Sequence, residues 1–151
     1  TDLPTISPPG KPYYPQQTAP ARAAGELPNL YVTDFIKDMA AAYAASDLVI
    51  SRAGAGSISE FCLLHKPVVL VPSPNVAEDH QTKNALALVD KQAAIYVKDS
   101  EAEAKLMDVA LNTVADDRKL KELSENIAKL ALPDSARIIA QEVIKLAEAE
   151  N

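Results

Sequence analysis

Cysteine, aromatic residues and long apolar runs are all scarce in this sequence. Its 151 residues include one cysteine, Cys62, and no tryptophan. A lone cysteine excludes an internal disulfide and fits a reducing compartment, and its apolar surroundings favour a small buried side chain. With 5% aromatic residues, the core has to be aliphatic. No apolar run approaches the roughly 20 residues of a membrane-spanning helix, and no basic, apolar signal segment opens the chain.

Positive charge and metal-binding patterns are also in short supply. Fifteen Lys and Arg residues against 21 Asp and Glu residues give a net charge of -6, which disfavours binding to nucleic acid or to an anionic membrane surface. No Cys and His set has metal-ligand spacing, and no D-x-D motif could hold a divalent cation on a diphosphate. A Ser, His and acid set for a nucleophilic triad is lacking as well. The sequence therefore predicts a binding site that uses no metal ion or other cofactor and has no evident catalytic base.

Proline is concentrated at the start of the chain, where seven of the eleven prolines precede residue 29. Proline removes a backbone donor and fixes φ, so this stretch cannot form a central strand or a long helix. We expect residues 1–28 to be an irregular, extended lead-in and residues 29–151 to form the domain. Because the chain also begins at Thr1, we expect it to be part of a larger protein.

From residue 30 onwards, apolar strands alternate with helices. The predicted strands are 30–32, 47–50, 67–71 and 94–97, and the predicted helices are 38–45, 57–64, 79–90, 101–113, 116–130 and 134–149. The strands have few polar positions, which is typical of parallel strands covered on both faces. The sequence thus predicts a doubly wound, Rossmann-like α/β fold. The last three helices are interpreted as packing elements, with Leu123 and Ile127 among the core residues.

The segment Ser51–Glu60, S-R-A-G-A-G-S-I-S-E, joins a strand to a helix. Gly54 and Gly56 would allow a tight turn and a close approach to a ligand. Free N–H groups and the helix dipole attract phosphate there, the dipole contributing roughly 0.3 to 2 kcal/mol. The spacing matches neither G-x-G-x-x-G nor a Walker loop. At the carboxyl ends of the strands, this loop should meet loops 34–37 and 72–81 at a site for a phosphorylated ligand.

Several polar residues near this edge have two interpretations each. Glu60 either completes a capping box with Ser57 or accepts the hydroxyls of a ribose. His80 and Gln81 either form a solvated helix start behind an acidic cap or bind sugar hydroxyls. Arg52 either contacts a phosphate or anchors its own loop.

Three ordered motifs carry a family resemblance that runs from about Gly10 to Leu146. They are V-T-D-F-I-K-D-M at 32–39, the glycine loop at 51–60, and E-D-H-Q-T-K-N-A at 78–85. Together they resemble the C-terminal, donor-binding domain of the MurG family. These bacterial transferases add N-acetylglucosamine (GlcNAc) from UDP-GlcNAc to undecaprenyl-diphosphate-MurNAc-pentapeptide.

The resemblance implies a GT-B fold, of which this chain would be the C-terminal half. The N-terminal domain, absent here, would carry the acceptor site, a glycine-rich loop with the proposed catalytic His, and the membrane contact. The whole protein would be peripheral at the cytoplasmic face of the bacterial inner membrane. The reaction implied is an inverting, metal-independent transfer, and we expect this chain alone to be inactive.

The resemblance also implies roles for individual residues in binding UDP-GlcNAc. Ile36 would contact the uracil through its backbone with Phe35 beside it. Ala55, Gly56 and Ser57 would face the diphosphate, Glu60 would bind the ribose, and Gln81, with His80, would bind the GlcNAc. Ile58 and Ser59 would also contact UDP-GlcNAc, and Arg52 and Gly54 would make weaker contributions.

Two alternative functions stay open at this point. The chain could be the soluble donor-binding subunit of a split UDP-GlcNAc transferase that recruits a separate membrane partner. It could also be a nucleotide-binding module that catalyses no transfer.

Overall fold

The computed structural model describes residues 3–6, 30–74 and 79–149. The chain divides into two compact units, Thr1–Ser46 and Asp47–Asn151. The sequence predicted no boundary at this point. Each unit contains a parallel sheet.

In the first unit, β1 (Leu3–Ile6) pairs in parallel with β2 (Leu30–Thr33), and α3 (Met39–Ala45) follows. Strand β1 corrects the expectation that the lead-in is irregular. Pro4 lacks an N–H, but among the described residues β1 pairs on one side only, and an edge strand tolerates proline. Residues 7–29 of the expected lead-in lie outside the described residues.

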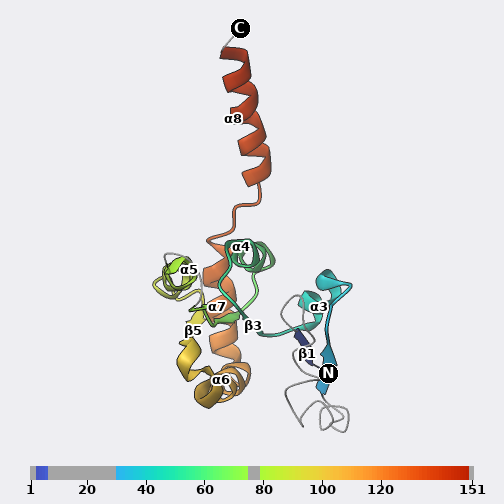
Figure 1. The fold of residues 1–151 in the computed structure, drawn as a ribbon, viewed down its shortest axis with the longest axis vertical. Helices are drawn as coiled ribbons and strands as arrows, with labels where there is room; N and C mark the ends of the chain where they lie inside the picture. Colours follow the sequence, from blue (N-terminus) through green and yellow to red (C-terminus); the bar gives the residue numbers. More distant parts are fainter. Residues whose placement is uncertain (1–2, 7–29, 75–78, 150–151) are drawn as a thin grey trace. The chain divides into compact units, whose positions relative to one another are not determined.

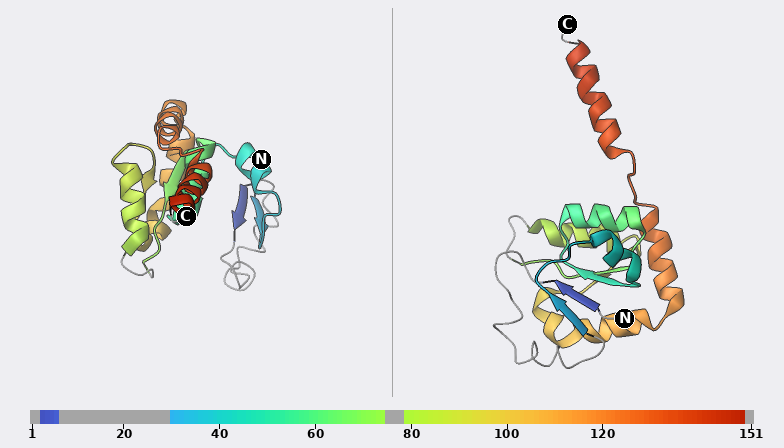
Figure 2. Two further views of the ribbon diagram at one scale, coloured as in Figure 1. Left: turned by 90° about the horizontal axis from the view of Figure 1, so that it is seen from above. Right: turned by 90° about the vertical axis from the view of Figure 1, so that its right-hand side faces the viewer.

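The second unit contains the predicted alternation of strands and helices. Its elements are β3 (Val49–Ser51), α4 (Ala55–Leu64), β4 (Val68–Leu70), α5 (His80–Val89), β5 (Ile95–Tyr96), α6 (Asp99–Val114), α7 (Asp117–Ala128) and α8 (Ser135–Ala149). The strands lie in the order β3-β4-β5 and both pairings are parallel. Helices α4 and α6 lie on opposite sides of this sheet, as Figures 1 and 2 show. The prediction of a parallel sheet with flanking helices is confirmed.

Strand β4 is the centre of the sheet, and all three of its residues are fully buried. Val69 belongs to a cluster with Val71 and Val97, against which Leu106 and Val109 of α6 pack. Burial on both faces explains why this strand has no polar positions. The carboxyl end of β4, where the next loop begins, therefore lies in the core.

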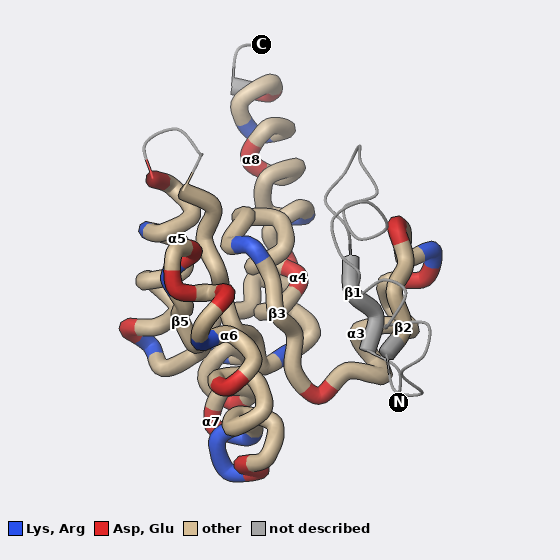
Figure 3. Tube along the Cα trace, turned by 60° about the horizontal axis from the view of Figure 1, so that its bottom comes forward, with Lys and Arg blue, Asp and Glu red and all other residues tan. Residues whose placement is uncertain are grey.

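Helix α7 packs against both α4 and α6 (Figure 1). The Asp116 carboxylate caps it by accepting a hydrogen bond from the Lys119 N–H at 3.2 Å. Leu123 and Ile127 are fully buried, which confirms their prediction as core residues. The solvent side carries charges of both signs (Figure 3), including a 2.8 Å ion pair between Lys119 and Glu122.

Helix α8 does not fit the prediction that it is a packing element. Every described side chain from 132 to 148 is exposed. The exposed apolar side chains of this helix include Ile138, Ile139, Val143, Ile144 and Leu146. Amphipathic spacing predicts that a helix has an apolar face, but it does not identify the surface that covers it. Among the described residues, no helix is both long and apolar enough to cross a membrane.

Candidate anion-binding site at the start of α4

The start of α4 presents backbone N–H groups with no partner inside the helix. The N-cap is Gly54, and the first intrahelical bond runs from the Ile58 N–H to the Gly54 carbonyl at 3.0 Å. The N–H groups of residues 54–57 precede that bond, and no side chain caps the helix. These donors, with the positive end of the helix dipole, suit an anion.

The two glycines of the loop leave room for a ligand. A Cβ atom added at Gly54 or Gly56 would meet no atom within 4 Å. Gly54 has φ −68°, a value that any residue adopts, so the turn at this position does not use the conformational freedom of glycine. The open space favours the other prediction, that a ligand approaches the backbone closely here.

The structure resolves the two interpretations of Glu60 in part. Helix α4 starts at Ala55, so Ser57 lies inside the first turn and is not the N-cap. The capping-box interpretation is therefore wrong. Glu60 lies one turn further along and is exposed, and its role with ribose stays a prediction. The Ser59 hydroxyl donates to the Ala55 carbonyl at 3.0 Å, within the same helix.

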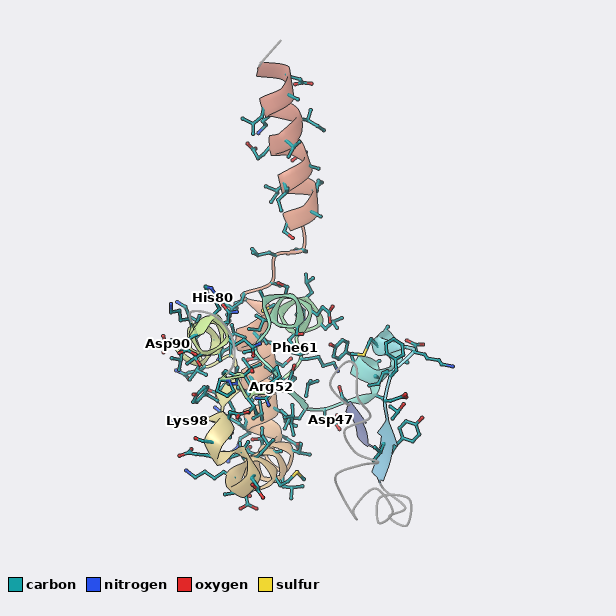
Figure 4. The ribbon with its side chains drawn as sticks, in the orientation of Figure 1. Asp47, Arg52, Phe61, His80, Asp90 and Lys98 are labelled. Carbon is teal, nitrogen blue, oxygen red and sulfur yellow. The ribbon has the colours of Figure 1, made fainter. Side chains whose placement is uncertain are left out.

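Gln81, at the start of α5, joins the loop after β3 to the loop after β4. Its side-chain oxygen accepts from the Ala53 N–H at 3.2 Å and from the Ser73 N–H at 2.9 Å. Both partners are donors, so the oxygen has to face them and the amide nitrogen keeps its donors for another group. The Asn84 amide donates to the Ala53 carbonyl at 3.2 Å. His80 is exposed at the start of α5 (Figure 4).

Arg52, labelled in Figure 4, connects three segments of the second unit. Its Nη1 donates to the carbonyls of Val71 at 3.1 Å and Pro72 at 3.3 Å. The same nitrogen pairs with the carboxylate of Asp99, the first residue of α6. This geometry supports the interpretation of Arg52 as an anchor of the loops. Contact between Arg52 and a phosphate stays a prediction.

Phe35 and Ile36 belong to the first unit. The Thr33 hydroxyl donates to the Phe35 carbonyl at 2.9 Å and accepts from the Phe35 N–H at 3.3 Å. This local turn leaves the Phe35 side chain 71% exposed, and Ile36 is half-buried. Their contribution to a shared nucleotide site stays a prediction.

Three residues near the loop received no role from the sequence, although the structure gives each of them a contact. The Asn84 amide donates to the Ala53 carbonyl, and the Ser73 N–H donates to the Gln81 side-chain oxygen. The Asp99 carboxylate pairs with the Arg52 guanidinium. Only Asn84 left a usable signal, because it lies three residues after Gln81 and positions three apart share a helix face. The described residues contain no group of three His, Cys, Asp or Glu side chains that could hold a metal ion.

Comparison with known proteins identifies the family. The profile of the glycosyltransferase family 28 C-terminal domain matches residues 10–139. The chain belongs to this family. Among the relatives, one protein of Bacteroides thetaiotaomicron is 96% identical over 142 residues and one of Bacteroides fragilis is 76% identical over 148 residues. Both are named UDP-N-acetylglucosamine--N-acetylmuramyl-(pentapeptide) pyrophosphoryl-undecaprenol N-acetylglucosamine transferase.

The matches cover 94% and 98% of this chain but 38% and 39% of those relatives. The chain thus spans about two fifths of the length of the curated relatives that it matches. The crystal structure of Acinetobacter baumannii MurG is similar with a TM-score of 0.74 and 32% identity, over 86% of this chain and 41% of that one. The relatives and the MurG structure confirm the resemblance to the MurG family. The family profile and the MurG structure together confirm the C-terminal half of a GT-B fold.

Proposed function

We propose that this chain binds the UDP-GlcNAc donor of an inverting glycosyltransferase that makes a lipid-linked peptidoglycan precursor. The acceptor would be undecaprenyl-diphosphate-MurNAc-pentapeptide. Its MurNAc 4-hydroxyl attacks the anomeric carbon of GlcNAc, UDP leaves, and the hydroxyl proton passes to a base elsewhere in the whole protein. The names of the Bacteroides relatives support this donor and this acceptor.

The observation that carries the proposal is the uncapped start of α4 under the open space at Gly54 and Gly56. As UDP leaves, negative charge develops on its diphosphate. Backbone N–H groups that already point at the phosphates stabilise this charge without moving, and the loss of one such donor costs about 3 kcal/mol at comparable sites. We therefore expect the reaction to need no metal ion.

Other residues would bind the ribose, the sugar and the uracil of the donor. We propose that the Glu60 carboxylate accepts the ribose hydroxyls and that the Gln81 amide nitrogen donates to a GlcNAc hydroxyl, with His80 beside it. Ile36 would contact the uracil through its backbone, and Phe35 would lie next to the base.

We also propose that the whole protein works as a peripheral protein at the cytoplasmic face of the bacterial inner membrane. The donor is a water-soluble nucleotide sugar, whereas the acceptor is anchored by its polyprenyl chain. An enzyme joining the two has to work at the membrane surface. Lipid contact and acceptor binding are assigned to the part of the protein outside this chain, since its net charge of -6 disfavours an anionic surface.

Titration of the chain with UDP, UDP-GlcNAc and UDP-GalNAc tests this function. Calorimetry should detect binding of UDP and tighter binding of UDP-GlcNAc than of UDP-GalNAc. Backbone amide shifts on titration should be confined to residues 36, 54–60 and 80–81. Absence of UDP binding, or shifts confined to other segments, would contradict the proposal.

A further inference from the structure

Two side chains of α5 hold the peptide groups on either side of Ala53. The Gln81 oxygen accepts from the Ala53 N–H, and the Asn84 amide donates to the Ala53 carbonyl, both at 3.2 Å. Ala53 itself is completely buried. The next residue is Gly54, the N-cap of α4. Helix α5 therefore holds the last peptide groups before the anion-binding helix.

The planarity of the peptide bond turns this contact into a constraint on the loop. In a trans peptide the C=O and the following N–H point in opposite directions. Asn84 directs the Ala53 carbonyl towards α5, so the Gly54 N–H has to point away from α5. Gln81 restrains the preceding peptide in the same way, and the two contacts together restrict φ and ψ of Ala53. The direction in which α4 leaves the loop depends on these angles.

The structure assigns Asn84 as a positioning residue for the diphosphate-binding loop. It acts through Ala53 and aims the N–H groups at the start of α4, and it touches no substrate itself. This inference rests on the proposed function, because it takes the diphosphate as the group that those N–H groups bind. It goes beyond that function because Asn84 orients the N–H groups at the start of α4, whereas the loop residues themselves carry those N–H groups.

The test compares UDP with uridine, which lacks the diphosphate. Asn84→Leu keeps the approximate size of the side chain and adds no charge, and Asn84→Ala is a second variant that favours the helix. Both remove the donor to Ala53. Matched controls are Asn126→Leu and Asn126→Ala, since the Asn126 amide also donates to a backbone carbonyl, that of Gln92, at 3.2 Å. Calorimetry measures both ligands, and amide spectra are recorded without ligand.

The Asn84 variants should bind UDP about tenfold more weakly and uridine with unchanged affinity. Their Gly54 amide resonance should move even without ligand, while the Asn126 variants match the original chain in both respects. Unchanged UDP affinity, equal losses for UDP and uridine, or an unmoved Gly54 resonance would overturn the positioning role. If the original chain itself binds UDP no better than uridine, the proposed function fails, and the role of Asn84 in diphosphate binding fails with it.

Discussion

The substitution Gly56→Ala should stabilise the chain while weakening nucleotide binding. Gly56 is the second residue of α4, and an added Cβ would meet no atom within 4 Å. Glycine within a helix costs roughly 0.5 to 1 kcal/mol relative to alanine, and replacing it also lowers the entropy of the unfolded chain. For a chain of 151 residues, the melting temperature should rise by about 1 to 4 °C.

The same methyl group would occupy the space in which the diphosphate approaches the backbone. Losing one hydrogen bond to a charged group costs roughly 1.5 to 3 kcal/mol. The affinity for UDP should therefore fall roughly tenfold or more. Calorimetry with UDP and thermal unfolding monitored by circular dichroism measure the two effects on the same protein sample.

Ser100→Ala is a matched control for the stability effect. Ser100 is the second residue of α6, as Gly56 is of α4, and it is exposed. The control should gain a few tenths of a kcal/mol in stability, roughly as helix propensities indicate, with no change in UDP affinity. A stabilised Gly56→Ala variant with unchanged UDP affinity would refute the diphosphate site at this loop. A destabilised variant would refute the open space above the helix.

Three further predictions concern single side chains. Glu60→Gln should keep its melting temperature and bind UDP several-fold more weakly, because an amide accepts hydroxyl protons less strongly than a carboxylate; unchanged affinity in calorimetry would remove the ribose contact. Gln81→Glu keeps an oxygen for its two backbone donors but loses the amide donor, so UDP-GlcNAc affinity should fall more than UDP affinity, and equal losses would argue against the sugar contact. Burial raises the pKa of the Cys62 thiol, so the unfolded chain loses this proton first and the free energy of unfolding should fall as the pH rises above about 8.5. Urea unfolding at neutral and alkaline pH should show a smaller fall for Cys62→Ala, and an equal fall would contradict this linkage.

Most elements of the second unit could be predicted from local sequence patterns. The apolar run at 67–71 predicts a buried strand, and β4 occupies Val68–Leu70. Strand β1 could not be predicted in this way, because its partner, β2, starts 27 residues after β1 does. A four-residue strand containing proline has too weak a local preference to be recognised without that partner.

The sequence could predict which segments form the site, but it could not predict which hydrogen bonds their side chains make. The glycine spacing and the strand before it identified a helix start for an anion. The predicted N-cap, Ser57, lies three residues after the observed one, Gly54. Ser57-x-x-Glu60 fits a capping box, whereas Gly54 has no side chain that could indicate a cap. Arg52 has the charge to bind a phosphate, and its bonds to backbone carbonyls become visible only when residues some 20 positions apart come together.

Gln81 illustrates why residue type alone leaves the chemistry open. An amide can accept and donate, and both abilities suit a sugar. The contacts to Ala53 and Ser73 commit the oxygen to the loops, which leaves only the donor for a ligand. The orientation of that donor then depends on the same two loops that Gln81 joins. A substitution that moves either loop should therefore alter recognition of the sugar as well as of the diphosphate. In such loop variants the affinities for UDP and UDP-GlcNAc should fall together, whereas Gln81→Glu should lower the affinity for UDP-GlcNAc more than that for UDP.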